Sequence, residues 1–274
     1  MIQAGTRLGD RYVLVDLVGR GGLGQVWRAH DTALGRVVAV KLMRALLSDD
    51  PGFMQRFRAY AQVIAGLDDP NIVGVYDVGQ TDGVAYLVTQ FVEGESLHAL
   101  LSRDGPLAPP HAMNLIAQAA RALHVAHSKW ILHLDVKASN LLVRPDGRLL
   151  VSDFRLARII SAESMAEVDE LVYTNSVYIA PEQFTGRPRS PSMDIYALGV
   201  VAYVCLMAQP FPGDEPNLVP PTYARQDPPP LPPHFPEAVR HVVQRALGRD
   251  HRARWPSAEA MGAAAAAAAI GHPG

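Results

Sequence analysis

The first ninety residues alternate short runs of β-branched and aromatic residues with glycines and aspartates. Such runs predict strands, because β-branched side chains favour extended backbone while glycine and aspartate favour turns. The predicted strands cover residues 12–18, 26–30, 37–43, 72–78 and 84–90. One helix is predicted among them, over residues 51–66, where Phe53, Phe57, Tyr60 and Ile64 recur near helical spacing.

The rest of the chain predicts mainly helices. Pro109 and Pro110 open a segment with an apolar stripe at helical spacing, and proline is favoured in the first turn of a helix. Residues 195–208 are an uncharged run of fourteen residues, short of the roughly twenty that cross a bilayer, and predict a buried helix. Residues 215–236 hold nine prolines and predict a loop. Seven consecutive alanines within residues 259–270 favour a terminal helix.

Composition narrows the class of protein. The chain has 274 residues, 49% apolar and 19% charged, which excludes a disordered tail or a coiled-coil rod. The formal net charge of -2 gives no general attraction to phosphate backbones, so nucleic acid is not expected as a partner. Cys205 is the one cysteine, which excludes an internal disulfide framework. Neither a secretion signal nor a membrane segment is predicted, and the expected location is cytoplasmic.

A glycine-rich segment separates the first two predicted strands; its glycines are Gly19, Gly21, Gly22 and Gly24. Glycine allows close approach of backbone to phosphates and positive φ, so the segment fits either a nucleotide-covering hairpin or an ordinary turn. A strand follows it, which argues against the dinucleotide-binding and P-loop types, since both need a helix there. Further on, Lys41 lies inside an apolar strand, where an ammonium without a partner is costly.

Three polar motifs follow in the second half of the chain. They are His-Leu-Asp-Val-Lys-Ala-Ser-Asn at residues 133–140, Asp-Phe-Arg at residues 153–155 and Ala-Pro-Glu at residues 180–182. Together with the glycine-rich segment and Lys41, their order and spacing resemble the eukaryotic-type serine/threonine protein kinase family, particularly its bacterial branch. The resemblance covers essentially the whole chain.

The resemblance implies a fold of the α+β class across residues 1–274. This bilobal protein-kinase-like fold has a small β-rich N-lobe with one helix (residues 1–89), a hinge (residues 90–94) and a larger, mainly helical C-lobe (residues 95–274). In the family, ATP binds between the lobes. The peptide-docking loop of the family is matched by residues 178–182, which favours a protein as the substrate.

The resemblance also implies a role for each matched residue. Asp135 would orient the substrate hydroxyl and accept its proton, and Lys137 would neutralise the transferring phosphoryl group. Asn140 and Asp153 would hold Mg²⁺. The remaining residues would bind ATP, with Lys41 on the α and β phosphates and the others around the phosphates and the adenine ring: Gly19, Gly21, Gly22, Gly24, Val26, Ala39, Gln90, Val92 and Leu142. Two structural contacts are also implied, from Asp194 to the catalytic loop and between Glu182 and Arg254.

Three positions depart from the family pattern. Tyr60 stands where the N-lobe helix usually carries a glutamate that pairs with the strand lysine, and residues 52–66 contain no carboxylate. Arg155 replaces the last glycine of the metal-binding motif, and we hypothesise that it stacks on Tyr60. Leu134 replaces the arginine before the catalytic aspartate, which removes the usual receptor for a phosphate on Thr174 or nearby.

The main prediction is an ATP- and Mg²⁺-dependent serine/threonine protein kinase that is slow or atypically regulated. One alternative is a pseudokinase, a nucleotide-binding or empty scaffold that docks a partner. A less favoured alternative is a small-molecule phosphotransferase. The expected partner is therefore a protein substrate or a docking protein, and the sequence does not indicate an oligomeric state.

Overall fold

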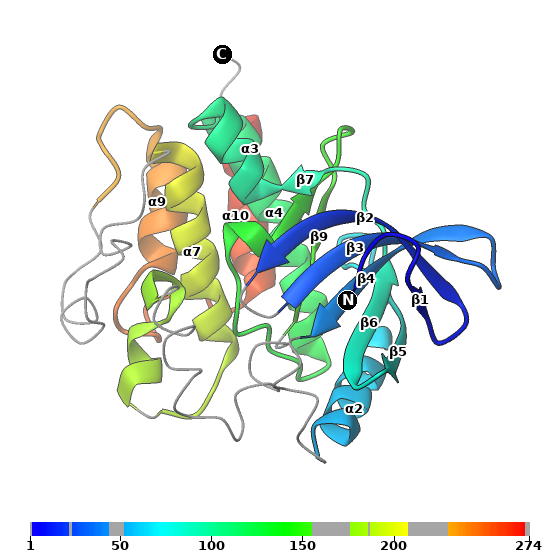
Figure 1. Ribbon diagram of the computed structural model, residues 1–274. Coiled ribbons are helices and arrows are strands. Elements are labelled where there is room, and N and C mark those ends of the chain that lie inside the picture. The colour runs from blue at the N-terminus through cyan, green and yellow to red at the C-terminus, as the bar shows by residue number, and fades with distance from the viewer. Residues whose placement is uncertain are drawn as a thin grey trace. The chain divides into compact units, whose positions relative to one another are not determined.

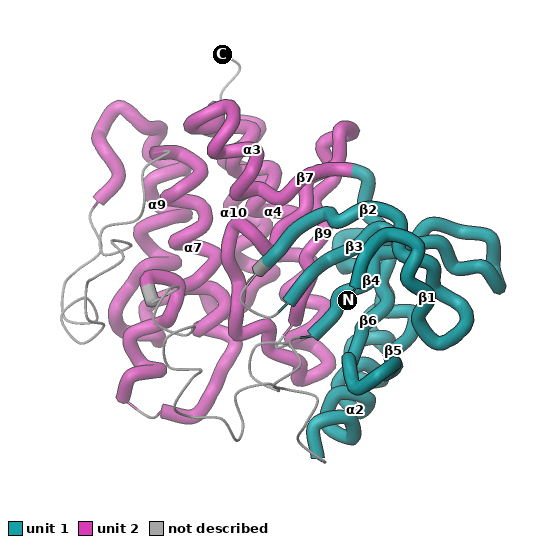
Figure 2. The backbone as a smooth tube through the Cα atoms, viewed as in Figure 1, with its two compact units in different colours: residues 1–93, 156–165 teal, residues 94–155, 166–274 magenta. Residues whose placement is uncertain are grey.

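The computed structural model describes residues 2–21, 24–43, 52–154, 176–185, 187–207 and 230–271 (Figure 1). Two compact units make up the chain: the described residues up to Glu93 form the first, and those from Gly94 onward form the second (Figure 2). The predictions for Gly22, Arg155 and Thr174, including the stacking of Arg155 on Tyr60, lie outside the described residues. So does most of the proline-rich segment.

An antiparallel sheet forms the body of the first unit, and among the described residues it has six strands in the order β1-β2-β3-β4-β6-β5. The strands are β1 (Arg7–Leu8), β2 (Tyr12–Gly21), β3 (Gly24–Asp31), β4 (Arg36–Met43), β5 (Val75–Thr81) and β6 (Val84–Gln90). Helix α2 (Phe53–Ala65) lies beside β5 and contacts it (Figure 1). The alternating strands predicted from the sequence, and the helix among them, are therefore confirmed in this unit.

One predicted strand starts later than expected. Residues 72–78 were predicted as a strand, but β5 begins at Val75. The reason is a turn just before it: Asn71 N donates to the Asp69 carboxylate at 2.8 Å and Ile72 N donates to the Asp69 carbonyl at 3.0 Å. An aspartate that bonds the backbone two residues on stabilises a turn and delays the strand. The two-residue strands β1 and β7 (Glu95–Ser96) were not predicted at all.

Helices dominate the second unit. They are α3 (Leu97–Asp104), α4 (Pro109–Ser128), α7 (Pro191–Met207), α9 (Glu237–Ala246) and α10 (Ala258–Ile270). A small antiparallel sheet accompanies them, formed by β7, β8 (Leu141–Val143) and β9 (Leu149–Val151). Short 3₁₀ turns complete the described elements: η1 (Ala138–Asn140), η2 (Ser176–Tyr178) and η3 (Pro181–Thr185).

Helix α4 is the centre of this unit and contacts both α7 and α10. Small residues let α10 approach closely, because a Cβ added to Gly262 would lie 3.1 Å from Ala120 Cβ. The apolar run predicted as a buried helix is confirmed as α7, in which Ile195, Leu198, Val200 and Cys205 are all buried. In the part of the chain that the structure describes, no helix is both long and apolar enough to cross a bilayer.

Candidate active site

The loop of residues 133–140 is held by a buried carboxylate on α7. Asp194 accepts hydrogen bonds from His133 N at 2.8 Å, Leu134 N at 2.7 Å and His127 Nε2 at 2.8 Å. Burial by itself would raise the pKa of Asp194, but the hydrogen bonds and electrostatic interactions with His127 and His133 together outweigh it, so the pKa is lowered. The predicted link from Asp194 to the loop is confirmed. It holds Leu134 at a φ of +58°, a conformation uncommon outside glycine.

His133 is fixed on both sides of its ring. Its Nε2 bonds the Ser152 carbonyl at 2.9 Å, and because a carbonyl only accepts, Nε2 carries the proton. Its Nδ1 then accepts from Asp135 N at 3.2 Å. The ring packs against Phe154, with centroids 4.6 Å apart. One histidine therefore ties the backbone of Asp135 to the segment before Asp153.

The carboxylate of Asp135 is held by two side chains from its own loop. Its Oδ2 accepts from Asn140 Nδ2 at 3.0 Å and lies 3.0 Å from Lys137 Nζ. Asn140 Nδ2 also donates to the Asp135 carbonyl at 2.8 Å. Both carboxylate contacts use the same oxygen, so within the described residues Oδ1 of Asp135 is left to accept from another molecule. The structure thus brings three of the predicted residues together.

Asn140 and Asp153 are brought close by the small sheet. The Asn140 carbonyl accepts from Ser152 N at 2.9 Å and from Ser152 Oγ at 3.0 Å, and Asp153 follows directly. Asp153 has a φ of +61°. With its Nδ2 used on Asp135, Asn140 offers its amide oxygen, and Asp153 offers carboxylate oxygens. Oxygen donors of this kind suit Mg²⁺, which keeps water and phosphate ligands besides a few protein ones.

Leu142, the residue predicted below the adenine ring, lies in β8 and is partly exposed. It pairs with Ser96 of β7 and with Leu150 of β9. Its neighbours Leu141 and Val143 are buried. The alternation of strand side chains therefore turns Leu142 to the face opposite that of Leu141 and Val143.

In the first unit, strands β2 and β3 form the glycine-rich hairpin. Gly19 pairs with Val26, and Gly21 pairs with Gly24. Gly24 has a φ of +146°, and a Cβ there would lie 1.8 Å from the Leu42 carbonyl oxygen. No other residue fits that position without moving the backbone of β4. At Gly19, by contrast, an added Cβ would have nothing within 4 Å.

Val26, Ala39 and Lys41 share one face of the sheet. Val26 pairs with Lys41 across β3 and β4, and Ala39 is two residues from Lys41 on the same strand. Directly paired residues, and residues two apart, point to the same side of a sheet. All three are partly exposed, whereas Val38 and Val40 on the opposite face are fully buried. The structure thus brings together the predicted adenine and phosphate contacts of this unit.

The predicted hinge begins at the end of β6. Gln90 N donates to the Gly74 carbonyl at 2.8 Å, and Thr89 Oγ1 donates to the Gln90 carbonyl at 3.3 Å. Val92, the second predicted hinge contact, is partly exposed. The Gln90 carbonyl thus already has an internal partner, which the sequence did not indicate.

Tyr60 lies on α2, where the family pattern has an acid. Its ring is 7% exposed and stacks with Phe57, with centroids 6.4 Å apart and planes 5° apart. Phe57 in turn stacks on Phe53 at 5.3 Å. The residue that replaces the acid thus belongs to an aromatic row along the buried face of the helix.

The predicted pair of Glu182 and Arg254 is confirmed. Arg254 Nη1 lies 2.7 Å from Glu182 Oε1, and Arg254 Nη2 lies 2.8 Å from Oε2. The side chain of Arg254 is 0% exposed and that of Glu182 is 6% exposed. Such a buried, two-pronged pair fixes geometry rather than performing chemistry.

Two side chains that support the site were missed by the sequence reasoning. His127 bonds Asp194, and Gln118 accepts from Leu149 N at 2.8 Å and donates to the Gly147 carbonyl at 3.0 Å. Both stand on α4, where single polar residues among apolar ones would have been the signal. Nothing in their spacing indicated which loop they contact.

Comparison with known proteins now identifies the class. A family model described as protein kinase domain matches residues 12–264, and the chain belongs to this family. Solved structures of the PknI kinase domain from Mycobacterium tuberculosis have the same fold; one aligns over 98% of this chain and 99% of its own, with a TM-score of 0.78 and 23% identity. The expected β-rich N-lobe and helical C-lobe of the kinase fold are therefore confirmed.

Several relatives are more similar in sequence. Serine/threonine-protein kinase PknA of Mycobacterium tuberculosis is 39% identical across 98% of this chain and 64% of its own length. Serine/threonine-protein kinase PrkC of Bacillus subtilis is 34% identical across 94% of this chain and 40% of its own. The chain therefore spans less than two thirds of the length of these relatives.

Proposed function

We propose that this chain is a serine/threonine protein kinase domain that transfers the γ-phosphate of ATP to protein hydroxyls with Mg²⁺. The names of its relatives support the class of reaction. The observation that carries the proposal is the arrangement around Asp135, whose Oδ2 is held by Lys137 and Asn140 at 3.0 Å each.

This arrangement suits proton transfer from a hydroxyl. A serine or threonine hydroxyl would donate its proton to Oδ1 of Asp135 while its oxygen bonds to the γ-phosphorus and the bond to the ADP oxygen breaks. Lys137 carries a positive charge beside the carboxylate and would stabilise negative charge that builds on the transferring group. His133 and Asp194 hold the loop in place without touching the substrate.

We assign the nucleotide and the metal to the residues that match the family's motifs. In the second unit, Asn140 and Asp153 would hold Mg²⁺, which would neutralise negative charge on the phosphates. Leu142 would contact the adenine ring from the same unit. In the first unit, Lys41 would bind the α and β phosphates, and the residues for the rest of the nucleotide would be Gly19, Gly21, Gly22, Gly24, Val26, Ala39, Gln90 and Val92.

Turnover is expected to be slow. Tyr60 offers no carboxylate to position Lys41, and a charge-assisted hydrogen bond contributes about 1.5 to 3 kcal/mol. Losing one that acts only in the transition state would slow transfer by roughly ten- to two-hundred-fold. The groups that act directly on the phosphates are all present in the sequence.

The two alternative functions have less support. A pseudokinase scaffold would not need the contacts that hold Asp135, Lys137 and Asn140 together, and no feature of the described residues favours it over catalysis. A small-molecule phosphotransferase would not need a peptide-docking loop like that matched by residues 178–182. Neither gains support from the named relatives, which are serine/threonine-protein kinases.

Transfer of labelled phosphate to casein tests the proposal. The Asp135→Asn variant should lose activity by about 10²- to 10⁴-fold, the usual contribution of a general base. Asp146→Asn, in the exposed turn between β8 and β9, is the matched control and should transfer normally. If the unchanged chain incorporates no more labelled phosphate into casein than Asp135→Asn does, the proposal is contradicted. Stabilisation by Mg²⁺-ATP in a thermal melt would then indicate a nucleotide-binding scaffold, and transfer to metabolites alone a small-molecule enzyme.

A further inference from the structure

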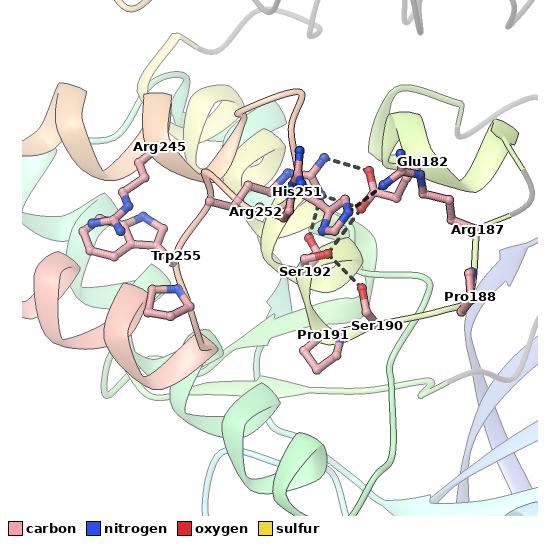
Figure 3. A pocket seen from close by; sticks show the side chains of 12 residues that line it. Glu182, Arg187, Pro188, Ser190, Pro191, Ser192, Arg245, His251, Arg252 and Trp255 are labelled. Atoms are coloured by element: carbon pink, nitrogen blue, oxygen red, sulfur yellow. Dashed lines mark hydrogen bonds and ion pairs between the residues drawn. The ribbon is translucent and has the colours of Figure 1, made fainter.

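A pocket of about 580 Å³ opens in the second unit, and none of the residues assigned to catalysis lines it (Figure 3). Its walls come from η3 and the segment after it, the start of α7, the end of α9 and the connection from α9 to α10. One acidic residue, Glu182, lines the pocket. The basic residues that line it are Arg187, Arg245, His251, Arg252 and Arg254. The volume lies in the usual range for ligand sites.

Most of these cations already have partners. Arg254 is saturated by Glu182 and by the carbonyls of Gly248, Ser192 and Arg249. Arg252 pairs with Asp250 at 3.0 Å, and this bond lowers the pKa of Asp250 to about 2. Neither arginine therefore brings net charge to the pocket.

Arg245 lies at one end of the pocket and Arg187 at the other, with His251 between them (Figure 3). The guanidinium of Arg245 lies over the ring of Trp255, 4.3 Å from its centroid. That stacking keeps Arg245 and the apolar wall of the pocket together. The end of the pocket at Arg245 is therefore aromatic, and the end at Arg187 is polar.

The polar end holds a guanidinium that bonds only a histidine. Arg187 Nη1 donates to His251 Nε2 at 2.8 Å, and among the described residues Arg187 has no carboxylate partner. Arg187 is exposed and His251 partly exposed, so a ligand can reach both. A guanidinium has further N–H donors, and because Nε2 of His251 accepts from Arg187, the ring proton is on Nδ1, which can donate to a ligand.

We propose that this pocket binds a phosphorylated serine or threonine side chain of a peptide. A phosphate monoester carries about -1.5 to -2 charges near neutral pH and three acceptor oxygens. Arg187 would supply positive charge and donors in the planar geometry that suits phosphate, and the Nδ1–H of His251 would add a further donor. A single carboxylate would match less of the charge.

The shape of the pocket favours a peptide over a free phosphate ion. Its volume is far larger than a phosphate group, and Pro188, Pro191 and Pro256 supply apolar wall beside the polar end. The wall from η3 (Pro181–Thr185) also overlaps residues 178–182, the segment that resembles the peptide-docking loop of the family. The inference goes beyond the proposed function and does not depend on it, because binding can be measured without phosphate transfer.

Fluorescence anisotropy with labelled peptides tests the inference on the full chain. The probes are Ala-Pro-phosphothreonine-Ala-Pro, the same peptide with threonine, and the same peptide with glutamate. The phosphorylated peptide should bind at least about tenfold more tightly than either of the others, as expected for one added charge-assisted contact. Saturating Mg²⁺-ADP should leave its affinity unchanged.

Variants separate a built site from a diffuse positive surface. Arg187→Ala should weaken phosphopeptide binding by roughly tenfold or more, and Arg187→Lys should fall between this variant and the unchanged chain. Arg121→Ala removes the same charge from an exposed position on α4 and should bind normally. A thermal melt with Mg²⁺-ATP shows that each variant is folded. His251→Phe, which keeps a ring but removes the N–H donor and the acceptor for Arg187, should also bind more weakly.

Four results would overturn the inference. Equal affinity for the phosphorylated and threonine peptides would exclude phosphate recognition. Equal loss in Arg187→Ala and Arg121→Ala would indicate general attraction. Displacement by Mg²⁺-ADP would place the phosphate in the nucleotide site. Inorganic phosphate that competes at the same affinity as the peptide would show that the peptide contributes nothing.

Discussion

The catalytic loop and the lysine-bearing face of the sheet hold their chemical groups by different forces. In the loop, Asp194 and His133 bind the backbone around Asp135 through hydrogen bonds of 2.7–3.2 Å, and Asn140 and Lys137 hold its carboxylate. On the sheet, Lys41 is placed by strand register, and the neighbouring helix presents an aromatic ring at Tyr60.

Because of this difference, the two regions should tolerate different kinds of amino-acid substitution. A buried polar network fails as a unit, because removing one member leaves the others without partners. A packed sheet face responds to volume and backbone conformation instead. The departures from the family pattern at Tyr60 and Leu134 spare both the hydrogen-bonded groups of the loop and the register of the sheet.

The largest effect is expected from Asp194→Asn. The amide cannot satisfy all the donors that now reach the carboxylate, and breaking a buried charged network typically costs about 3 to 5 kcal/mol. The free energy of unfolding in urea should fall by about that amount. Asp250→Asn, which breaks an exposed pair with Arg252, is the control and should change stability little. A wild-type unfolding curve for Asp194→Asn would show that the loop is not held in this way.

Gly24→Ala should give a smaller loss in the first unit. The new Cβ would meet the Leu42 carbonyl, so β3 or β4 must shift, at a cost of about 1 to 3 kcal/mol. Gly83→Ala is the matched control: Gly83 also has positive φ, +77°, but nothing lies within 4 Å of its added Cβ. Thermal melts compare the two variants: Gly24→Ala adds a steric clash to the backbone strain, whereas Gly83→Ala adds backbone strain alone. Equal losses would mean that the contact with Leu42 does not matter.

Tyr60→Glu should sharpen the comparison by adding a charged contact to the packed region. If the glutamate pairs with Lys41, kcat/KM for ATP should rise by about tenfold, the effect of one charge-assisted hydrogen bond. Stability should fall, because the variant removes a ring from the aromatic row. In the control Tyr60→Gln, glutamine has nearly the same shape as glutamate but no charge. This variant should lose stability without any rise in kcat/KM for ATP. A gain in both variants would exclude an ion pair as the cause.

The smallest effect concerns a carboxylate in the first unit. The hydrogen bond from Arg11 lowers the pKa of Asp31 to about 2. Because the folded state favours the carboxylate, its stabilisation is complete above pH ~4, the ordinary range for Asp, and is lost as the pH falls toward 2. The difference in melting temperature between the unchanged chain and Arg11→Met should therefore shrink as the pH falls through this window. A difference that stays constant from pH ~5 to pH ~2 would contradict the link.

Much of the fold could be predicted from the sequence, because alternating and helical spacings are local properties. The strands around Lys41 and helix α4 follow such patterns, whereas an uncharged apolar run predicted α7 and consecutive alanines predicted α10. Element ends were harder to place: β5 starts late because Asp69 caps a turn that competes with the strand. The two-residue strands β1 and β7 exist only through their partners, so no local pattern marks them.

For the candidate site, too, some features could be predicted from the sequence and others could not. Motif spacing identified Asp135, Lys137 and Asn140, but it did not show that one oxygen of Asp135 takes both contacts. That detail depends on side-chain geometry. The pocket was also missed, because its polar pair joins Arg187 to His251 across 64 residues of sequence. No spacing rule connects positions that meet only after the helices have packed.

Leu134 has one more consequence. Its backbone N–H is already bound to Asp194, and its side chain cannot receive a phosphate as the arginine of the family does. Asp194 thus holds this part of the loop through the backbone of residue 134, without a side-chain contact to a phosphate. We therefore expect that a phosphate on Thr174 or nearby would not be bound at this position.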